Sequence, residues 1–205
     1  MNWLFVHYIE IFGAFTGIIY VFLEIKRNIW LWPLGIVTSA VYIYVFYQSK
    51  FYADMGLQWY YLFISIYGWI IWGRAKKIEN AGSKEDGESE RVREEKGIVI
   101  SNIKYRQIMV LSLITGFLFV VIWFILVRFT DSTIPGWDAF TTALSISATW
   151  MLARKIIEHW YLWVIVNLVS IGLYIYKGLY PTVILFIVYT LMAFAGYREW
   201  RKNIN

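Results

Sequence analysis

The chain has 205 residues, of which 60% are hydrophobic, 20% aromatic and only 16% charged. A water-soluble fold of this length could not bury so much apolar surface, so the composition predicts an all-α membrane protein and excludes a soluble domain. The net charge of +5 would favour nucleic-acid binding in a soluble protein, but the basic residues here fall between apolar segments, as topology signals. We therefore expect a lipid bilayer and no nucleic acid as partner.

Seven apolar segments, each long enough for one helical crossing, divide the chain. They span residues 3–24, 30–48, 55–73, 107–127, 137–153, 160–176 and 181–197. The first lacks a basic leader and is interpreted as a retained helix. The fourth is apolar all round, as expected for a helix that only returns the chain across the membrane. The predicted organisation is a first three-helix repeat (1–73), a charged cytoplasmic linker (74–106), a linker transmembrane helix (107–127), and a second three-helix repeat with a short cytoplasmic tail (137–205).

Lys and Arg lie almost entirely in alternate gaps between these segments. Sixteen of the 19 basic residues follow the first, third, fifth or seventh segment, and only Lys50, Arg128 and Lys177 lie on the other side. Cytoplasmic loops carry this excess of positive charge. The pattern predicts a multi-pass protein of the inner-membrane type, with its N-terminus outside and its C-terminus in the cytoplasm.

A weak internal repeat supports the division into triplets. Displacing the chain by 128 positions gives nine identities over 41 ungapped positions, where about three or four are expected by chance for this composition. Matched pairs include Trp32 with Trp160, Gly68 with Gly196 and Trp72 with Trp200. Two like-oriented triplets joined by one helix form the parallel-repeat architecture of some transporters, in which solutes bind near mid-membrane between the repeats.

Enzymatic chemistry is not expected. The chain has no phosphate-binding loop motif, no H-E-x-x-H and no G-x-S-x-G, and its only histidines are His7 and His159. With no cysteine, neither a metal site nor a thiol nucleophile is predicted, and no cofactor. Glu10, near the outer end of the first segment, is the only acid expected at apolar depth, so a passive carrier without ion coupling is the simplest interpretation.

Polar and aromatic residues share helix faces in three segments, because spacings of three and four bring side chains together. The candidate substrate-binding residues are Trp160, Trp163, Asn167, Ser170 and Tyr174 in the sixth segment, Gln58 and Tyr61 in the third, and Thr38 and Tyr42 in the second. An unpaired amide facing lipid would cost several kcal/mol, so Asn167 and Gln58 should point inward. The alternative for these amides is an interhelical hydrogen bond without a ligand.

Four other tryptophans, Trp30, Trp32, Trp72 and Trp200, are expected in the aromatic belts at the membrane interfaces. An aromatic cavity with amides and without a countercharge suits a flat heteroaromatic ring, particularly a cationic one, because cation–π attraction is worth about 0.5–2 kcal/mol.

The sequence resembles the PnuC-type vitamin transporters. The motifs that carry the resemblance are WPLGI (32–36), YADMGLQ (52–58), YGWIIWG (67–73), and ARKIIEHWYLWVIVN with SIGLYIYKGLY (153–180). This resemblance implies a bacterial inner-membrane facilitator with a SWEET-like 3+1+3 fold, usually a homotrimer. It also implies transport of an unphosphorylated vitamin or nucleoside, typically nicotinamide riboside, which a cytoplasmic kinase then traps. Trp160, Trp163, Asn167 and Gln58 fall where the family places substrate contacts.

Two alternatives stay open. Relatives of this short type carry thiamine, which is also a flat cation, and the motifs do not separate the two cargoes. From a different class, the chain could be a membrane scaffold or receptor that acts through its cytoplasmic linker.

Overall fold

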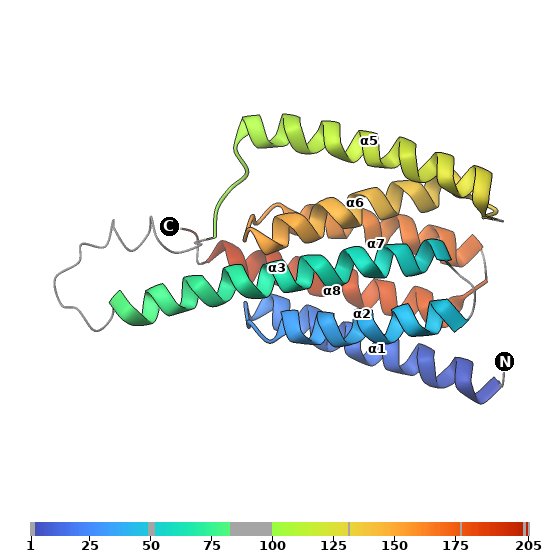
Figure 1. The fold of residues 1–205 in the computed structure, drawn as a ribbon, viewed down its shortest axis with the longest axis horizontal. Helices are drawn as coiled ribbons and strands as arrows, with labels where there is room; N and C mark the ends of the chain where they lie inside the picture. Colours follow the sequence, from blue (N-terminus) through green and yellow to red (C-terminus); the bar gives the residue numbers. More distant parts are fainter. Residues whose placement is uncertain are drawn as a thin grey trace. The chain divides into compact units, whose positions relative to one another are not determined.

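The computed structural model describes residues 3–48, 52–82, 100–130, 132–176, 178–202 and 204. Seven helices follow one another in these described residues, which confirms the predicted all-α class (Figure 1). They are α1 (Trp3–Ile25), α2 (Leu31–Gln48), α3 (Tyr52–Gly82), α5 (Tyr105–Phe129), α6 (Pro135–Ala153), α7 (His159–Tyr176) and α8 (Tyr180–Arg201).

Helix α3 is longer than the apolar segment that predicted it. It continues past Gly73 to Gly82, because the sequence there is rich in Ala, Lys and Glu and contains no proline. The first part of the charged stretch is therefore helical. Residues 83–99 of the predicted linker (74–106) lie outside the described residues.

By length and composition, three helices in the described part of the chain are apolar enough to cross a membrane: α5, α7 and α8. Shorter apolar stretches lie within α1 and α2, at Ala14–Ile25 and Leu31–Val45. Helix α5 has no buried residue. This fits the prediction that the fourth segment presents a lipid-like surface.

The chain divides into two compact units, residues 1–99 (unit 1) and 100–205 (unit 2). In unit 1, α2 packs against both α1 and α3. In unit 2, α6 packs against α5 and α7, and α7 packs against α8. Helix α5 joins α6 through a 2.6 Å hydrogen bond between the Thr115 and Ser147 hydroxyls.

The sequence repeat corresponds to a repeated packing arrangement. In unit 1 the Trp32 ring lies directly on the backbone of α3 at Gly68, where an added Cβ would stand 2.5 Å from the ring. Trp72 meets Trp32 edge to face, with ring centroids 5.4 Å apart and planes at 87°. This arrangement locks the start of α2 to the last third of the α3 apolar segment.

Unit 2 contains the same arrangement 128 positions later. The Trp160 ring lies on Gly196 of α8, 2.4 Å from the position of an added Cβ, and meets Trp200 edge to face at 5.9 Å and 86°. Trp200 is fully buried.

The interface-belt prediction is therefore wrong for three tryptophans. Trp32 and Trp200 are fully buried and Trp72 is 3% exposed, because each packs against a glycine-bearing helix or another indole within its unit. Trp30 is 67% exposed, as a belt residue would be.

The α1–α2 and α6–α7 loops also share one backbone path. Each leaves its helix through a residue in the left-handed region, Arg27 and Lys155, both with φ of 53°. In each loop the following N–H donates to the carbonyl five residues earlier at 2.9 Å; these bonds run from Asn28 to Leu23 and from Ile156 to Met151. This is the Schellman helix end, with a basic residue where glycine is usual.

The segment before α5 is tied to the α6–α7 loop. Ser101 forms an isolated parallel bridge there: its N–H donates to the Lys155 carbonyl and its carbonyl accepts from the Ile157 N–H, both at 3.1 Å. The Ile103 N–H donates to Oε2 of Glu158 at 3.0 Å. We call these three hydrogen bonds the clasp. The clasp fixes the entry to α5 beside the start of α7.

Candidate functional site

Helix α7 carries five of the nine predicted binding residues. Trp160, Trp163, Asn167, Ser170 and Tyr174 recur at spacings of three and four and share one face of the helix. The helix starts beside the clasped α6–α7 loop and is held against α8 by the Trp160–Gly196 contact. Its polar face is therefore carried by a firmly packed element.

Asn167 is the most informative residue on this face. Its side chain is 5% exposed, yet it makes no hydrogen bond to any described residue. Ser170, one turn further along α7, is 7% exposed and also makes no such bond. A buried polar group without a partner costs about 1–3 kcal/mol, so these groups are available to a solute or to water. An interhelical hydrogen bond within the described residues, the alternative for Asn167, is not present.

The two tryptophans of the motif have different surroundings. Trp160 is 1% exposed, with its ring pressed on Gly196 and enclosed by His159 and Trp200. Trp163 is half-buried, and its buried indole N–H has no hydrogen-bond partner. The Trp160 indole N–H is likewise buried without a partner, so the two differ in exposure: part of Trp163 is accessible, while Trp160 packs α7 against α8.

Tyr174 ends the face at the far end of α7. Its ring is half-buried and lies 5.1 Å from that of Phe186 on α8, with planes tilted by 48°.

The other four predicted residues lie in unit 1 and are half-buried. Thr38 donates its hydroxyl proton to the Leu34 carbonyl at 2.8 Å, so this hydroxyl is partly engaged by its own helix. Gln58 makes no hydrogen bond to a described residue, whereas Tyr42 and Tyr61 both have interaction partners. Unit 1 therefore presents one amide and several hydroxyl groups from α2 and α3.

Several buried polar residues of unit 1 were not among the predicted binding residues. Ser39 on α2 is 4% exposed and Ser65 on α3 is 3% exposed. Glu24, in the last turn of α1, is 2% exposed and lies near Tyr20. Sequence reasoning missed Glu24 because it is the last residue of the first predicted segment, next to the basic pair, where a carboxylate is expected to reach water. For Ser39, the 128-residue register was the available signal.

Three helices of unit 1 meet at Gly35. A Cβ added there would stand 2.7 Å from the Ser65 hydroxyl oxygen and 3.3 Å from the Tyr20 ring. The glycine is required because Ser65 and Tyr20 fill the space of a side chain. Hydroxyl groups from α1 and α3 thus gather against α2.

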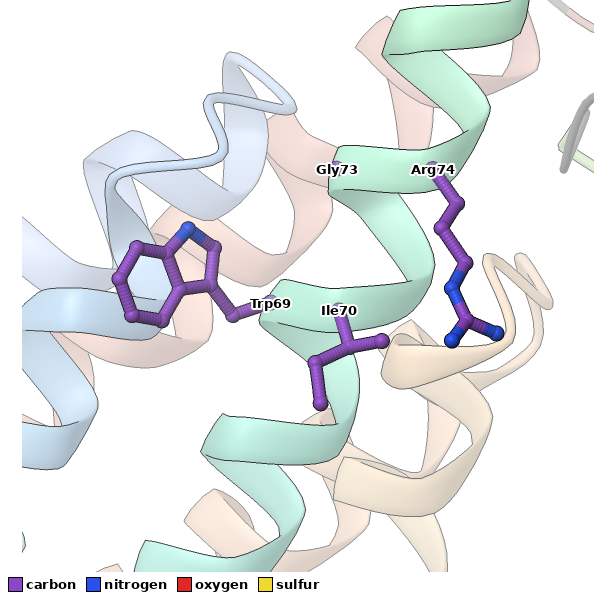
Figure 2. A pocket seen from close by; sticks show the side chains of 4 residues that line it. All are labelled: Trp69, Ile70, Gly73 and Arg74. Atoms are coloured by element: carbon purple, nitrogen blue, oxygen red, sulfur yellow. The ribbon is translucent and has the colours of Figure 1, made fainter.

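A shallow depression of about 390 Å³ lies on α3, lined by Trp69, Ile70, Gly73 and Arg74. Figure 2 shows the Trp69 and Arg74 side chains directed to opposite sides of the helix. None of the nine predicted residues lines it, and Tyr61, the nearest of them along α3, is eight positions away, about 12 Å along a helix axis. The depression therefore lies further along α3 than the predicted binding residues.

Comparison with known proteins identifies relatives over nearly the whole chain. The model of the family described as nicotinamide mononucleotide transporter matches residues 7–202. The nicotinamide riboside transporter PnuC of Escherichia coli (strain K12) is 25% identical over 212 residues, which cover 94% of this chain and 84% of that protein. The riboflavin/roseoflavin transporter RibM of Streptomyces davaonensis is 24% identical over 191 residues, covering 93% and 83%. The crystal structure of the vitamin B3 transporter PnuC has the same fold, with a TM-score of 0.66, 23% identity, and coverage of 93% of this chain and 79% of that one.

Proposed function

Because the chain belongs to the nicotinamide mononucleotide transporter family, the PnuC-type vitamin transporters that its motifs resemble, we propose that it carries nicotinamide riboside across the bacterial inner membrane by facilitated diffusion. A cytoplasmic kinase would then trap the imported nicotinamide riboside by phosphorylating it. The observation that carries the proposal is Asn167, a buried amide on an apolar helix without a hydrogen-bond partner in the described chain. Such a group needs a polar ligand in place of water.

The charge of the interior favours a nucleoside over a nucleotide. Among the described residues, no Lys or Arg is buried. A phosphate group carried through apolar surroundings would need a cationic partner, because an unpaired buried charge is very costly. The proposed substrate is therefore unphosphorylated. Its cationic ring suits the half-buried indole of Trp163.

Each binding residue has a proposed role. Trp163 stacks on the ring, Asn167 hydrogen-bonds the polar substituent of the ring, and Gln58 with Thr38 or Tyr42 holds the hydroxylated part. Trp160 holds α7 in place against α8 and closes one end of the aromatic surface. Ser170, Tyr174 and Tyr61 complete the lining.

The topology in this proposal is seven membrane-spanning helices in a SWEET-like 3+1+3 order, with the N-terminus outside and the C-terminus in the cytoplasm. The repeated Trp–Gly–Trp packing of Trp32, Gly68 and Trp72 and of their counterparts supports two equivalent triplets joined by α5. Transport would proceed by movement of one triplet relative to the other, within a homotrimer.

The direct test is uptake by the purified protein in liposomes. Labelled nicotinamide riboside, thiamine and riboflavin are compared, riboflavin because a relative carries it. We expect saturable uptake of nicotinamide riboside and its loss in Asn167→Ala, with an unchanged amount of protein in the membrane. Uptake of thiamine or riboflavin without uptake of nicotinamide riboside would show that the proposed substrate is wrong. Full activity of Asn167→Ala would reject the proposed site.

Uniport has its own test, and Glu24 is the residue to watch because it is a buried carboxylate. At zero membrane potential, a uniporter stops at equal concentrations inside and outside, whether or not a pH gradient is imposed. Accumulation driven by a proton gradient and lost in Glu24→Gln would show coupling instead of uniport.

The scaffold alternative is tested by deleting residues 82–96: a carrier keeps its flux, whereas a scaffold loses its function.

A further inference from the structure

The 128-residue register holds in three dimensions beyond the tryptophans. It relates Trp32 to Trp160, Gly68 to Gly196, and the left-handed residues Arg27 and Lys155. The same register relates Ser39 on α2 to Asn167 on α7. Both are buried to the same degree, with 4% and 5% of their surface exposed.

Ser39 also shares with Asn167 its lack of a hydrogen-bond partner. No described residue accepts or donates a hydrogen bond to its side chain. A serine inside a helix commonly donates to the carbonyl four residues earlier, as Thr38 does to Leu34. The buried Ser39 hydroxyl can therefore both donate and accept a hydrogen bond. The half-buried Thr38 hydroxyl already donates its proton to the Leu34 carbonyl.

The neighbourhood of Ser39 is uncharged and rich in hydroxyl groups. One turn earlier on α2, Gly35 contacts the hydroxyl of Ser65, which is 3% exposed and lacks a partner in the described chain, and the ring of Tyr20. In unit 2 the counterpart of Gly35 is Trp163 and that of Ser65 is the buried Ala193. Unit 2 thus offers an indole and an amide, which suit a conjugated ring, whereas unit 1 offers small hydroxyls, which suit a hydroxylated group.

We propose that Ser39 is a substrate-binding residue, and that its hydroxyl hydrogen-bonds the sugar part of the transported nucleoside. The inference rests on the proposed function and adds to it a contact in unit 1 at the position equivalent to Asn167. Repeat transporters bind solutes with residues from both repeats near mid-membrane. Ser39 is the more deeply buried of two adjacent hydroxyls on α2, at 4% exposed against the half-buried Thr38.

The experiment compares Ser39→Ala with Thr149→Val in liposomes reconstituted with the full-length protein. Thr149 on α6 is the control because its buried hydroxyl already donates to the Ser145 carbonyl at 2.8 Å and has no proposed role in binding. Labelled nicotinamide riboside is the substrate, and KM and Vmax are measured separately. Loss of one neutral hydrogen bond of about 1 kcal/mol corresponds to a roughly five-fold weaker interaction. We expect a roughly five-fold rise in KM for Ser39→Ala with Vmax unchanged, and no change in either constant for Thr149→Val.

A second measurement assigns the contact to the sugar. The inhibition constant of 1-methylnicotinamide, a cationic ring without ribose, should be the same for wild type and Ser39→Ala. Wild-type KM in Ser39→Ala, or an equal rise in Thr149→Val, would overturn the proposal. Weaker competition by the sugar-free ring would overturn the assignment to the sugar.

Failure of the inference is distinct from failure of the proposed function. If Asn167→Ala loses uptake while Ser39→Ala keeps its KM, only the contact in unit 1 is rejected. If wild type does not carry nicotinamide riboside, or if Asn167→Ala keeps full uptake, the proposed function or its site is rejected as well.

Discussion

Replacing Gly196 with alanine should destabilise unit 2 by forcing the Trp160 ring off α8. The new Cβ would stand 2.4 Å from two atoms of the indole, whereas ordinary contact begins at 3.4 Å, so the ring must retreat by about 1 Å. The ring has little room to retreat, because Trp160 is 1% exposed and is enclosed by His159 and Trp200. Overpacking of this kind costs about 1–3 kcal/mol.

The assay is thermal unfolding of the detergent-purified protein, followed by size-exclusion chromatography with Trp fluorescence. For a chain of this length, 1 kcal/mol shifts Tm by about 2–4 °C, so Gly196→Ala should lower Tm by about 2–12 °C. Gly172→Ala is the matched control, since Gly172 lies on α7 in the same unit and its added Cβ meets nothing within 4 Å. That change should leave Tm unchanged or raise it slightly, because alanine favours helix over glycine.

A smaller ring should relieve the strain. In the double variant Gly196→Ala with Trp160→Phe, the loss of Tm should be less than the sum of the two single losses, because the phenyl group leaves space for the new methyl. Wild-type Tm in Gly196→Ala, or strict additivity in the double variant, would refute the claim that this contact locks α7 to α8.

Three further outcomes follow from local geometry. Arg27→Gly and Lys155→Gly should each raise Tm slightly, by the equivalent of up to about 1 kcal/mol, because glycine adopts their left-handed backbone without steric cost; lower Tm values would show that the basic side chains stabilise these helix ends. Ser101→Pro should increase proteolysis near α5 because it removes the N–H of the clasp, whereas Ser101→Ala keeps that N–H and should behave as wild type; equal cleavage of both would count against the clasp. Thr115→Val should cost about 0.6 kcal/mol in thermal unfolding, because Thr115 donates to its own helix and accepts from Ser147; an unchanged Tm would indicate that the Ser147 hydroxyl finds another acceptor.

The sequence predicted the helices well because long apolar runs bounded by charged or turn residues have few alternative structures. It could not predict that α3 runs on to Gly82, since solvated Lys- and Glu-rich residues form helix or irregular chain with similar ease. It also could not predict the clasp. Ser101 and Ile103 are held by backbone groups and one carboxylate that lie more than 50 positions away, and no local pattern encodes such a contact.

For the binding faces, helical periodicity placed Asn167 and Ser170 on a common face but could not show which residues are buried or paired. Periodicity and the family resemblance both placed Trp160 among the substrate contacts, but neither could show that its ring packs on Gly196 and is 1% exposed. On α2 periodicity indicated Thr38, and it could not show that the adjacent Ser39 is the more deeply buried hydroxyl, because that depends on the packing of α2 against α1 and α3.

The clasp also sets the rotational phase of the α5 helix. Insertions or deletions within residues 83–99 leave the clasp intact, because they change only the length of chain that precedes it. One residue added between Ile103 and Tyr105 instead turns α5 by about 100° about its own axis, which swings Thr115 away from Ser147 and presents a different row of side chains to α6. Changes of length in the linker, residues 83–99, therefore leave the phase of α5 unchanged, whereas changes between Ile103 and Tyr105 disrupt it.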